Sequence, residues 1–317
     1  MRVAIVGAGA IGGFIAAALS HAGISVGVVA RGAHLDAIRR NGLHVSGDLG
    51  AFSVAVDAAE DLRELGTFDA LILTFKAHQW PQLLEQVRDP RFVDATIVTL
   101  QNGVPFWFVR HPPLQTVDPG GAIAAAFGDD RIVGGVVHVS GRIEAPGRIV
   151  QSGGLRYLLG VVSPHATPRA QALQEAMCCA GLSVELDDAI RAPVWLKLVN
   201  NVGLNSVSTL SRASIRTMLE RPEYLVAVRD LMRETLDVGK AMGIVAEVDL
   251  DARLAYASRL DDVRTSMLQD YEAGRQLEID PMLGAVVELA RRYDVSVPHV
   301  SDAYARLRQM TTSVSSG

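Results

Sequence analysis

A glycine-rich loop follows the first apolar run of the chain and constrains its fold more than any other feature. The run Val3–Val6 indicates a buried strand, and Gly7-Ala8-Gly9-Ala10-Ile11-Gly12 follows it directly. The stretch Ile11–Ala22 then has helical spacing. In such a unit the three glycines permit a tight turn, a close approach of backbone to a diphosphate, and close helix–strand packing. The loop predicts a dinucleotide-binding unit with Gly7, Gly9, Ala10, Ile11 and Gly12 at the cofactor; the alternative is a purely structural glycine turn.

Short apolar runs alternate with helical stretches through the first half of the chain. Further strands are expected at Ser25–Ala30, Ala70–Thr74 and Thr96–Leu100, and helices at Ala33–Arg40 and Gln79–Val87. This alternation predicts a parallel sheet wound by helices on both faces. Short strands with glycine turns follow at Ile132–Val139, Arg148–Val150 and Arg156–Leu159, then a helix over Pro168–Ala180 and a strand over Ser183–Leu186.

Strand patterns almost vanish after about residue 188. Helical periodicity is found at Val194–Thr209, Tyr224–Met242, Ala252–Tyr271, Pro281–Tyr293 and Ser301–Met310, and the tail Thr311–Gly317 is expected to fray. The sequence therefore predicts an α/β Rossmann-type N-terminal domain, residues 1–188, and a mostly α-helical C-terminal domain, residues 189–317.

The composition argues against several classes of protein. A net charge of −5 provides no basic surface for nucleic acid. No apolar run approaches the roughly 20 residues of a membrane span, and the immediate first strand leaves no room for a signal peptide, so a cytoplasmic location is expected. The two cysteines, Cys178 and Cys179, are adjacent and are interpreted as core filler. No spacing of histidines and acids suits a metal site.

The end of the second predicted strand bears on the choice of cofactor. An NAD site usually places an acidic residue there to bind the ribose hydroxyls, but the sequence has Ala30, Arg31 and Gly32. A guanidinium favours a 2′-phosphate through charge-assisted hydrogen bonds. The sequence thus favours NADP, with Arg31 as the phosphate ligand; the alternative is an ordinary exposed arginine.

Two polar loops follow later strands, at the sheet edge where ligands of such folds bind. Lys76 follows the strand that ends at Thr74, and Asn102 follows the strand that ends at Leu100. The lysine can meet a carboxylate or phosphate, and the asparagine can bind the nicotinamide ribose or the substrate. His78 is either an acid–base group or a half-exposed loop histidine. Each of these residues also has an alternative interpretation as plain surface polarity.

Lys197, Asn201 and Asn205 are spaced four residues apart on a helix predicted to run from Arg191 through Asn205. They share one face, which drifts by about 40° per step. Because their neighbours are apolar, burying a lysine and two amides is costly unless these groups bind something. The face predicts a ligand site; a solvated polar stripe is the alternative.

The chain resembles the ketopantoate reductase (2-dehydropantoate 2-reductase) family over nearly its whole length. The resemblance rests on the glycine loop, Lys76-Ala77, Asn102-Gly103, Trp195-x-Lys197-Leu198 with Asn201 and Asn205, and Ser266-Met267-Leu268-Gln269-Asp270 followed by Gly274-Arg275 and Glu278-Ile279-Asp280. It implies the NADPH-dependent reduction of 2-dehydropantoate to pantoate, a step of pantothenate biosynthesis. By the same resemblance, Lys197 is the general acid and Glu278 an active-site carboxylate. The resemblance also implies that substrate is held by Asn201, Asn205, Ser266 and Asn102, with Lys76 and Asn102 on the cofactor side, and it supports Arg31 as the phosphate ligand.

These residue types suit the reduction of a ketone. Hydride transfer to the carbonyl carbon leaves an alkoxide, which a lysine ammonium can stabilise and then protonate. Burial should lower the pKa of Lys197, and Glu278 should partly restore it. The amides and the Ser266 hydroxyl can bind the other substrate oxygens without adding charge, and no metal is required.

The spacing of Ser266 and Glu278 requires a break in the chain between them. Twelve residues correspond to about 120° around one uninterrupted helix, so the two side chains would diverge. Gly274 is expected to end or bend that helix and leave Glu278 on a connection before a helix that starts at Pro281.

The sequence departs from the family at Val263, where some members have asparagine, and at Ser206, where proline is frequent. Both departures bear on substrate specificity.

Two alternative functions remain open from the sequence. The same fold can reduce another small 2-oxo acid, as in opine-type or hydroxy-acid dehydrogenases. The chain can also be a non-catalytic redox sensor that binds NADPH, although a sensor has no need of the Lys197 face together with Glu278. The expected partner is a small-molecule 2-oxo acid, and a homodimer is compatible with the helical second domain.

Overall fold

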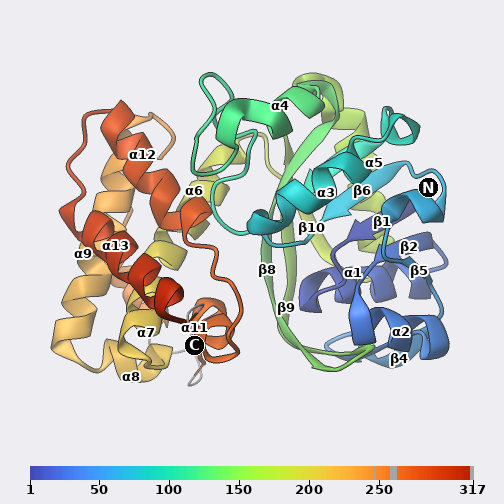
Figure 1. Cartoon of the computed structure of the whole chain (residues 1–317), viewed down its shortest axis with the longest axis horizontal. Helices are drawn as coiled ribbons and strands as arrows, with labels where there is room; N and C mark the ends of the chain where they lie inside the picture. The colour runs from blue at the N-terminus through green and yellow to red at the C-terminus, as the bar shows by residue number, and fades with distance from the viewer. Residues whose placement is uncertain (246–247, 258–262, 315–317) are drawn as a thin grey trace. The chain divides into compact units, whose positions relative to one another are not determined.

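A computed structural model describes residues 1–245, 248–257 and 263–314. The chain divides into two compact units (Figure 1), of which the first comprises Met1–Gln101 with Ala122–Ile190 and the second comprises Asn102–Gly121 with Arg191–Gly317. The chain passes between the units three times, the last time after Ile190. The boundary predicted between residues 188 and 189 lies two residues before that point. The sequence assigns residues 102–121 to the first domain, whereas the structure packs them with the second unit.

A ten-stranded mixed sheet forms the first unit. Its strands are β1 (Arg2–Val6), β2 (Ser25–Val29), β3 (Leu43–Gly47), β4 (Gly50–Val54), β5 (Asp57–Ala59), β6 (Ala70–Leu73), β7 (Thr96–Thr99), β8 (Ile132–Ala145), β9 (Arg148–Val161) and β10 (Ser183–Leu186). The order is β4–β3–β9–β8–β7–β6–β1–β2–β5, and β10 also pairs with β9. The strands from β5 to β8 are parallel and run 5-2-1-6-7-8, so the order reverses beside β1 as in a Rossmann fold. The predicted fold class is confirmed.

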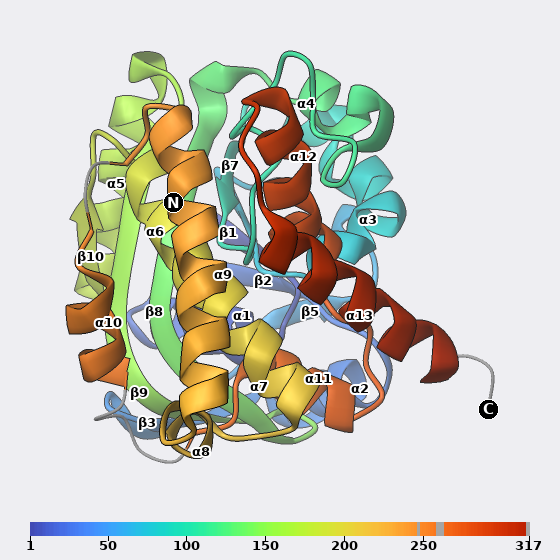
Figure 2. The same ribbon diagram turned by 90° about the vertical axis from the view of Figure 1, so that its left-hand side faces the viewer.

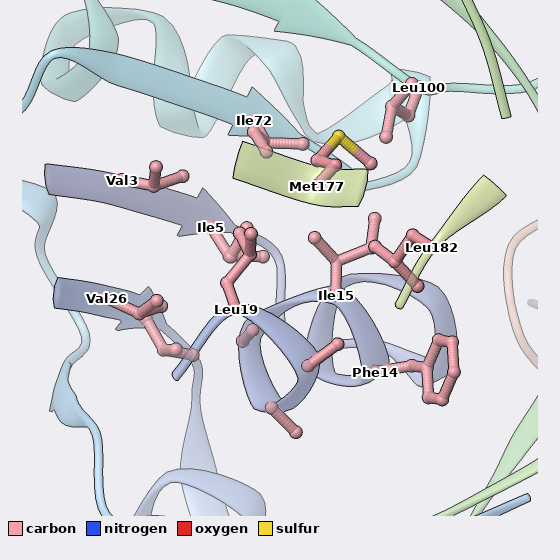
Figure 3. Packing of buried hydrophobic residues seen from close by; sticks show 14 of the residues in the cluster. Val3, Ile5, Phe14, Ile15, Leu19, Val26, Ile72, Leu100, Met177 and Leu182 are labelled. Atoms are coloured by element: carbon pink, nitrogen blue, oxygen red, sulfur yellow. The ribbon is translucent and has the colours of Figure 1, made fainter. Parts of the chain in front are cut away.

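Helices cover both faces of this sheet. They are α1 (Ala10–His21), α2 (Gly32–Asn41), α3 (Trp80–Val87), α4 (Ala122–Ala126) and α5 (Thr167–Cys179), with short turns η1 (Leu62–Leu65), η2 (Ala77–Gln79), η3 (Pro90–Phe92), η5 (Asp129–Arg131) and η6 (Pro164–Ala166). Figure 3 shows Phe14, Ile15 and Leu19 of α1 packed among side chains that include Val3 and Ile5 of β1. Ala4 and Val6 alternate with Val3 and Ile5 along β1, so their side chains lie on the other face of the sheet. They are equally buried, so both faces of the sheet are covered.

The predicted short strands after residue 131 are in fact one long hairpin. β8 and β9 are each 14 residues long and pair antiparallel, with register shifts between His138 and Ser140, Ser140 and Gly141, and Ile143 and Ala145. Gly141 lies at one of these irregularities, which shows why the sequence misleads: a glycine inside a strand marks a bulge as readily as a turn. The β3–β4 hairpin was not predicted, although Leu43-His44-Val45-Ser46 alternates in polarity and precedes glycine-rich residues.

The interpretation of the two cysteines as core filler is wrong, since both are exposed. The buried positions of α5 are Ala170, Leu173 and Met177, which recur with helical spacing. Cys178 and Cys179 directly follow the last of these, and Cys178 Sγ donates to the Val184 carbonyl of β10 at 3.8 Å.

The second unit is helical in its longer part. It contains α6 (Arg191–Asn200), η7 (Asn201–Asn205), α7 (Ser206–Ser211), α8 (Ile215–Leu219), α9 (Pro222–Ala241), α10 (Leu250–Ala257), α11 (Ser266–Glu272), η8 (Asp280–Gly284), α12 (Ala285–Arg292) and α13 (Pro298–Val314), together with the turn η4 (Pro119–Gly121). The long helix α9 contacts α6, η7, α12 and α13 (Figure 2). The Trp195 indole of α6 is fully buried and donates to the Thr235 carbonyl of α9 at 3.0 Å. A Cβ at Gly239 would lie 2.2 Å from that indole nitrogen, so the close contact of the two helices needs a glycine.

Three helix predictions in this unit need correction. The stretch predicted as one helix from Val194 to Thr209 is α-helical, then π-helical in η7, then α-helical again. The helix predicted over Ala252–Tyr271 is not continuous, since residues 263–265 are not helical; residues 258–262 lie outside the described part. The tail expected to fray from Thr311 is helical through Val314, and residues 315–317 are outside the description. None of the helices in the described part is both long and apolar enough to span a bilayer.

Candidate active site

Gly7 and Gly12 shape the loop after β1 for two different reasons. Gly7 has φ +106°, and a Cβ there would lie 2.6 Å from the Phe75 backbone nitrogen. A Cβ at Gly12 would lie 2.2 Å from the Gly7 carbonyl oxygen and 2.3 Å from Thr74 Oγ1. A side chain at either position would therefore force the loop away from β6.

Gly9 has a different environment, because a Cβ there would meet nothing within 4 Å. It is the exposed N-cap of α1, so no side chain caps the first turn, and that turn holds no acidic residue. The N–H groups at the start of α1, from Ala10, Ile11 and Gly12, can thus meet an anion with the helix dipole behind them. The bare backbone at Gly9 fits the diphosphate of a dinucleotide.

Arg31 lies where the sequence predicts it, just beyond β2 and at the N-cap of α2. The side chain is exposed, and Nη1 donates to Gln82 Oε1 of α3 at 2.9 Å. The sequence did not indicate this contact, because Gln82 is 51 residues away along the chain.

The loop after β6 contains Lys76 and His78, both partly buried. The Lys76 N–H donates to Gln79 Oε1 at 3.1 Å, which closes the turn η2. Gln101, at the end of β7, donates through Nε2 to the Phe75 carbonyl at 2.9 Å. The two polar loops at this edge of the sheet are thus joined within the first unit.

In the second unit, the Glu278 carboxylate acts electrostatically on the Lys197 amino group. Lys197 is partly buried on α6, and Glu278 is only 9% exposed. Burial lowers the pKa of Lys197 from 10.5 to about 8, and the Glu278 carboxylate acts in the opposite direction. Both directions agree with the expectation from the sequence. The connection predicted around Glu278 is also present: α11 ends at Glu272, Gly274 has φ +65°, and the next helical turn begins at Asp280.

Asn201 and Asn205 are the first and last residues of the π-helical segment η7. Asn201 is partly buried and Asn205 is 7% exposed. The predicted drift of 40° per step assumes a continuous α-helix and does not hold here, because a π-turn bonds i to i+5 and is wider. Such insertions recur at functional sites.

Ser266 is exposed at the first position of α11. The preceding Thr265 caps this helix by accepting from Leu268 N, and Thr265 Oγ1 donates to Ser208 Oγ of α7 at 3.2 Å. Because α11 contacts both α7 and η7, Ser266 lies on an element packed against the one that carries the two asparagines. Val263, three residues earlier, is 45% exposed, and Ser206 is fully buried with no hydrogen-bond partner for Oγ.

Asn102 is the first residue of the segment that joins the second unit. Next to it, Gly103 has φ +84°, and a Cβ there would lie 2.5 Å from the Pro281 carbonyl oxygen. Val104 N donates to that same oxygen at 2.7 Å. The loop of Asn102 therefore lies against the first turn of η8, three residues beyond Glu278.

The candidate residues fall into two groups. The second unit contains Lys197, Asn201, Asn205, Ser266, Glu278 and Asn102, and the first unit contains the glycine loop, Arg31 and Lys76. In the described part of the chain, no group of three or more histidines, cysteines or acids could hold a metal ion.

Comparison with known proteins identifies the family. Residues 3–164 match the family model described as ketopantoate reductase PanE/ApbA, and residues 189–311 match the model of its C-terminal part. A 2-dehydropantoate 2-reductase from Mesorhizobium japonicum is 36% identical over 318 aligned positions, which cover 98% of each chain.

Solved structures give the same result. A protein assigned as a ketopantoate reductase from Ralstonia solanacearum superposes with a TM-score of 0.91 at 32% identity, covering 99% of this chain and 98% of that one. D-mandelate dehydrogenase with NADH and anilino(oxo)acetate superposes with a TM-score of 0.87 at 20% identity, covering 99% and 100% of the two chains, a likeness that shows the fold alone. The glycine loop fits a nicotinamide cofactor, and the matched models span both units. The chain therefore belongs to the ketopantoate reductase family of oxidoreductases.

Proposed function

We propose that this chain is an NADPH-dependent reductase that converts 2-dehydropantoate to pantoate, a step of pantothenate biosynthesis. The observation that carries the proposal is the pairing of Lys197 with the buried Glu278 carboxylate. With a pKa of about 8, the Lys197 amino group is mostly protonated at neutral pH yet releases its proton more easily than an ordinary lysine. The names of the similar curated proteins support 2-dehydropantoate as the substrate.

The roles of the protein groups follow from this pairing. When bound, the reduced nicotinamide supplies hydride for the carbonyl carbon of the substrate. Lys197 donates a hydrogen bond to the carbonyl oxygen, stabilises the negative charge that develops there and then protonates it. Glu278 favours the charged form of Lys197. Asn201, Asn205, Ser266 and Asn102 bind the remaining substrate oxygens with neutral hydrogen-bonding groups.

On the cofactor side, the first turn of α1 binds the diphosphate. Lys76, in the loop after β6, also binds the cofactor. Arg31 binds the 2′-phosphate, which makes NADPH the preferred cofactor. Two features support this role: no acid lies at the end of β2, and the Arg31 side chain is exposed there.

A second candidate is the reduction of another small 2-oxo acid, of the opine or hydroxy-acid type. The observation that favours it is Val263, an apolar residue that is 45% exposed and precedes Ser266 by three positions. An apolar group near the substrate-binding serine suits a 2-oxo acid with a hydrocarbon side chain.

Steady-state assays with purified protein separate the candidates. NADPH oxidation is measured with 2-dehydropantoate, 2-oxoisovalerate and phenylglyoxylate, and each is repeated with NADH. We expect the highest kcat/KM for 2-dehydropantoate with NADPH. A higher value for another acid would establish the second candidate. Tight NADPH binding in calorimetry with no turnover of any acid would favour a redox sensor and overturn the proposal.

Replacing the proposed general acid tests the mechanism. Lys197→Ala should lower kcat by about 10²–10⁴, the usual weight of general acid catalysis, while the Kd for NADPH changes little. Lys240→Ala is a matched control, because Lys240 lies in the same helical unit with its side chain 36% exposed. Turnover at the wild-type rate in Lys197→Ala would remove Lys197 from the mechanism.

A further inference from the structure

The connection that carries Glu278 has little secondary structure of its own. Leu277, Glu278 and Ile279 are buried, but residues 275–279 form neither helix nor strand. The position of Glu278 is therefore set by the elements at each end of this short stretch. At the far end, the Ile279 carbonyl accepts from Met282 N at 3.3 Å and from Gly284 N at 3.2 Å, so the residue next to Glu278 is bonded into the first turn of η8.

That first turn is held by the C-terminal helix α13. Tyr304 Oη donates to Asp280 Oδ1 at 2.7 Å, and Arg308 Nη1 donates to Tyr304 Oη at 3.0 Å. Arg308 Nη1 also lies 3.6 Å from Asp280 Oδ1. Asp280 starts the helical stretch, where a carboxylate interacts favourably with the helix dipole. The Asp280 side chain is thus fixed at a point two residues from Glu278.

The sequence of η8 permits a close approach of Tyr304. A Cβ at Gly284 would lie 3.2 Å from both Tyr304 Oη and Tyr304 Cε2, so the ring packs against bare backbone. On another side, Val104 N bonds to the Pro281 carbonyl. The turn is therefore held by a backbone contact from the loop of Asn102 and by the side chains of Tyr304 and Arg308 from α13.

We propose that Tyr304 is a positioning residue of the reductase, which holds Glu278 beside Lys197 through the Tyr304–Asp280 hydrogen bond. The inference rests on the proposed function, in which Glu278 keeps Lys197 protonated. The Glu278 carboxylate raises the pKa of Lys197, so moving Glu278 away would lower that pKa. The groups that act on the Tyr304 hydroxyl are Asp280 and Arg308.

Tyr304→Phe removes the hydroxyl and leaves the ring against Gly284. We expect kcat with 2-dehydropantoate to fall about 10-fold, since small misplacements of catalytic groups are costly, while the Kd for NADPH stays the same. The basic limb of the kcat/KM profile, expected near pH 8 in the wild-type protein, should move to lower pH, because a looser Glu278 lowers the pKa of Lys197. Tyr293→Phe is the matched control, because Tyr293 is a 45% exposed tyrosine just after α12.

Two changes at Asp280 separate positioning from general structural damage. Asp280→Ala should move the profile in the same direction as Tyr304→Phe, and the double variant should be no worse than Asp280→Ala alone, because both changes break the same Tyr304–Asp280 hydrogen bond. Asp280→Asn keeps an acceptor oxygen and should restore most of kcat. Additive losses in the double variant would contradict the proposal.

A direct titration keeps the inference testable without turnover. The sequence has three lysines, Lys76, Lys197 and Lys240, so carbon-13 labelling of lysine gives few signals to assign. The Lys197 signal should titrate at lower pH in Tyr304→Phe than in the wild-type protein. An unshifted Lys197 titration together with wild-type kcat would overturn the inference. A shifted titration in a protein that reduces no 2-oxo acid would leave the inference standing and remove the proposed function.

Discussion

Arg31 is the single residue on which the proposed choice of cofactor depends. In Arg31→Ala the charged hydrogen bonds to the 2′-phosphate are lost, and such bonds are worth about 1.5–3 kcal/mol. The Kd for NADPH should therefore rise about 10- to 100-fold, while the Kd for NADH should change little. Calorimetric titrations with both cofactors measure the two values. Arg40→Ala is the control, because Arg40 is an exposed arginine of α2, the helix that Arg31 precedes. An equal loss of affinity for NADPH and NADH in Arg31→Ala would refute the phosphate assignment.

His34 gives the first unit a defined response to pH. Its Nδ1 accepts from Gly147 N at 3.0 Å, which requires a neutral ring, and burial lowers its pKa below 6.5 although the Ala8 backbone acts in the opposite direction. The unfolded chain therefore takes up this proton first, so the stabilisation is complete above pH 6.5 and is lost as the pH falls below it.

The size of this effect can be measured by denaturant unfolding at a series of pH values. His34→Gln keeps a polar side chain without the titration, so it should lose the part of the pH dependence below pH 6.5 that arises from His34, about 0.5–1.5 kcal/mol for one hydrogen bond. His165→Gln, at an exposed histidine, should leave the wild-type curve unchanged. Identical curves for His34→Gln and the wild-type protein would show that the ring does not titrate with folding.

For single residues, the local sequence predicts which ones belong to the candidate site better than it predicts the contacts that hold them in place. Lys197 and Asn205 stand out because they are polar among apolar neighbours at helical spacing, and that contrast is visible in the sequence. Gln82 and Tyr304 carry no such contrast. Each acts through a partner far along the chain, Arg31 for the first and Asp280 for the second, and such contacts exist only after folding.

Helices and strands were predicted best where the spacing of apolar residues is typical of only one kind of element. β10 begins and ends at the predicted residues, because Ser-Val-Glu-Leu alternates polar and apolar side chains, which is typical of a half-buried strand. The π-helical segments η7 and η8 could not be predicted in this way. A π-turn is defined by its i→i+5 hydrogen bonds, and no residue type in the sequence marks where such a turn replaces the α-helical pattern.

α12 fixes the segment 102–121 to the second unit mainly through Glu288. The carboxylate accepts from Gln115 N and Thr116 N, both at 3.0 Å, and from Thr116 Oγ1 at 2.9 Å. Burial alone would raise the pKa of Glu288, but these donors and Arg292 hold it below its usual value. Arg292 also donates to the carbonyls of Pro112 and Pro113, at 2.6 and 2.8 Å.

Glu288→Gln should release this segment without changing the size of the side chain. Losing the charged acceptor should cost about 1.5–3 kcal/mol, so thermal unfolding should occur at lower temperature. Hydrogen exchange at the amides of Gln115 and Thr116 should become faster. Glu220→Gln, at an exposed glutamate, should change neither measurement. Unchanged exchange at these two amides would show that Glu288 does not fix the segment.

For the whole molecule, the sequence predicted two domains of the observed types but not the unit to which every segment belongs. The segment 102–121 follows a strand of the first unit, so its place in the chain suggests that it stays there. Its partner Glu288 lies 172 residues from Thr116, and no local pattern indicates such a contact. The expected homodimer stays a prediction.

Each unit is built from two separate stretches of chain, because the chain crosses between units after Gln101, Gly121 and Ile190. The two family models divide the sequence differently, since the first spans residues 3–164 and includes the segment 102–121. A chimera of two relatives joined near Ile190 would therefore take this segment from one parent and α12 from the other. In such a chimera the hydrogen bonds of Glu288 and Arg292 to residues 112–116 would connect the two parents, and the segment would stay in place only where its backbone follows the same path.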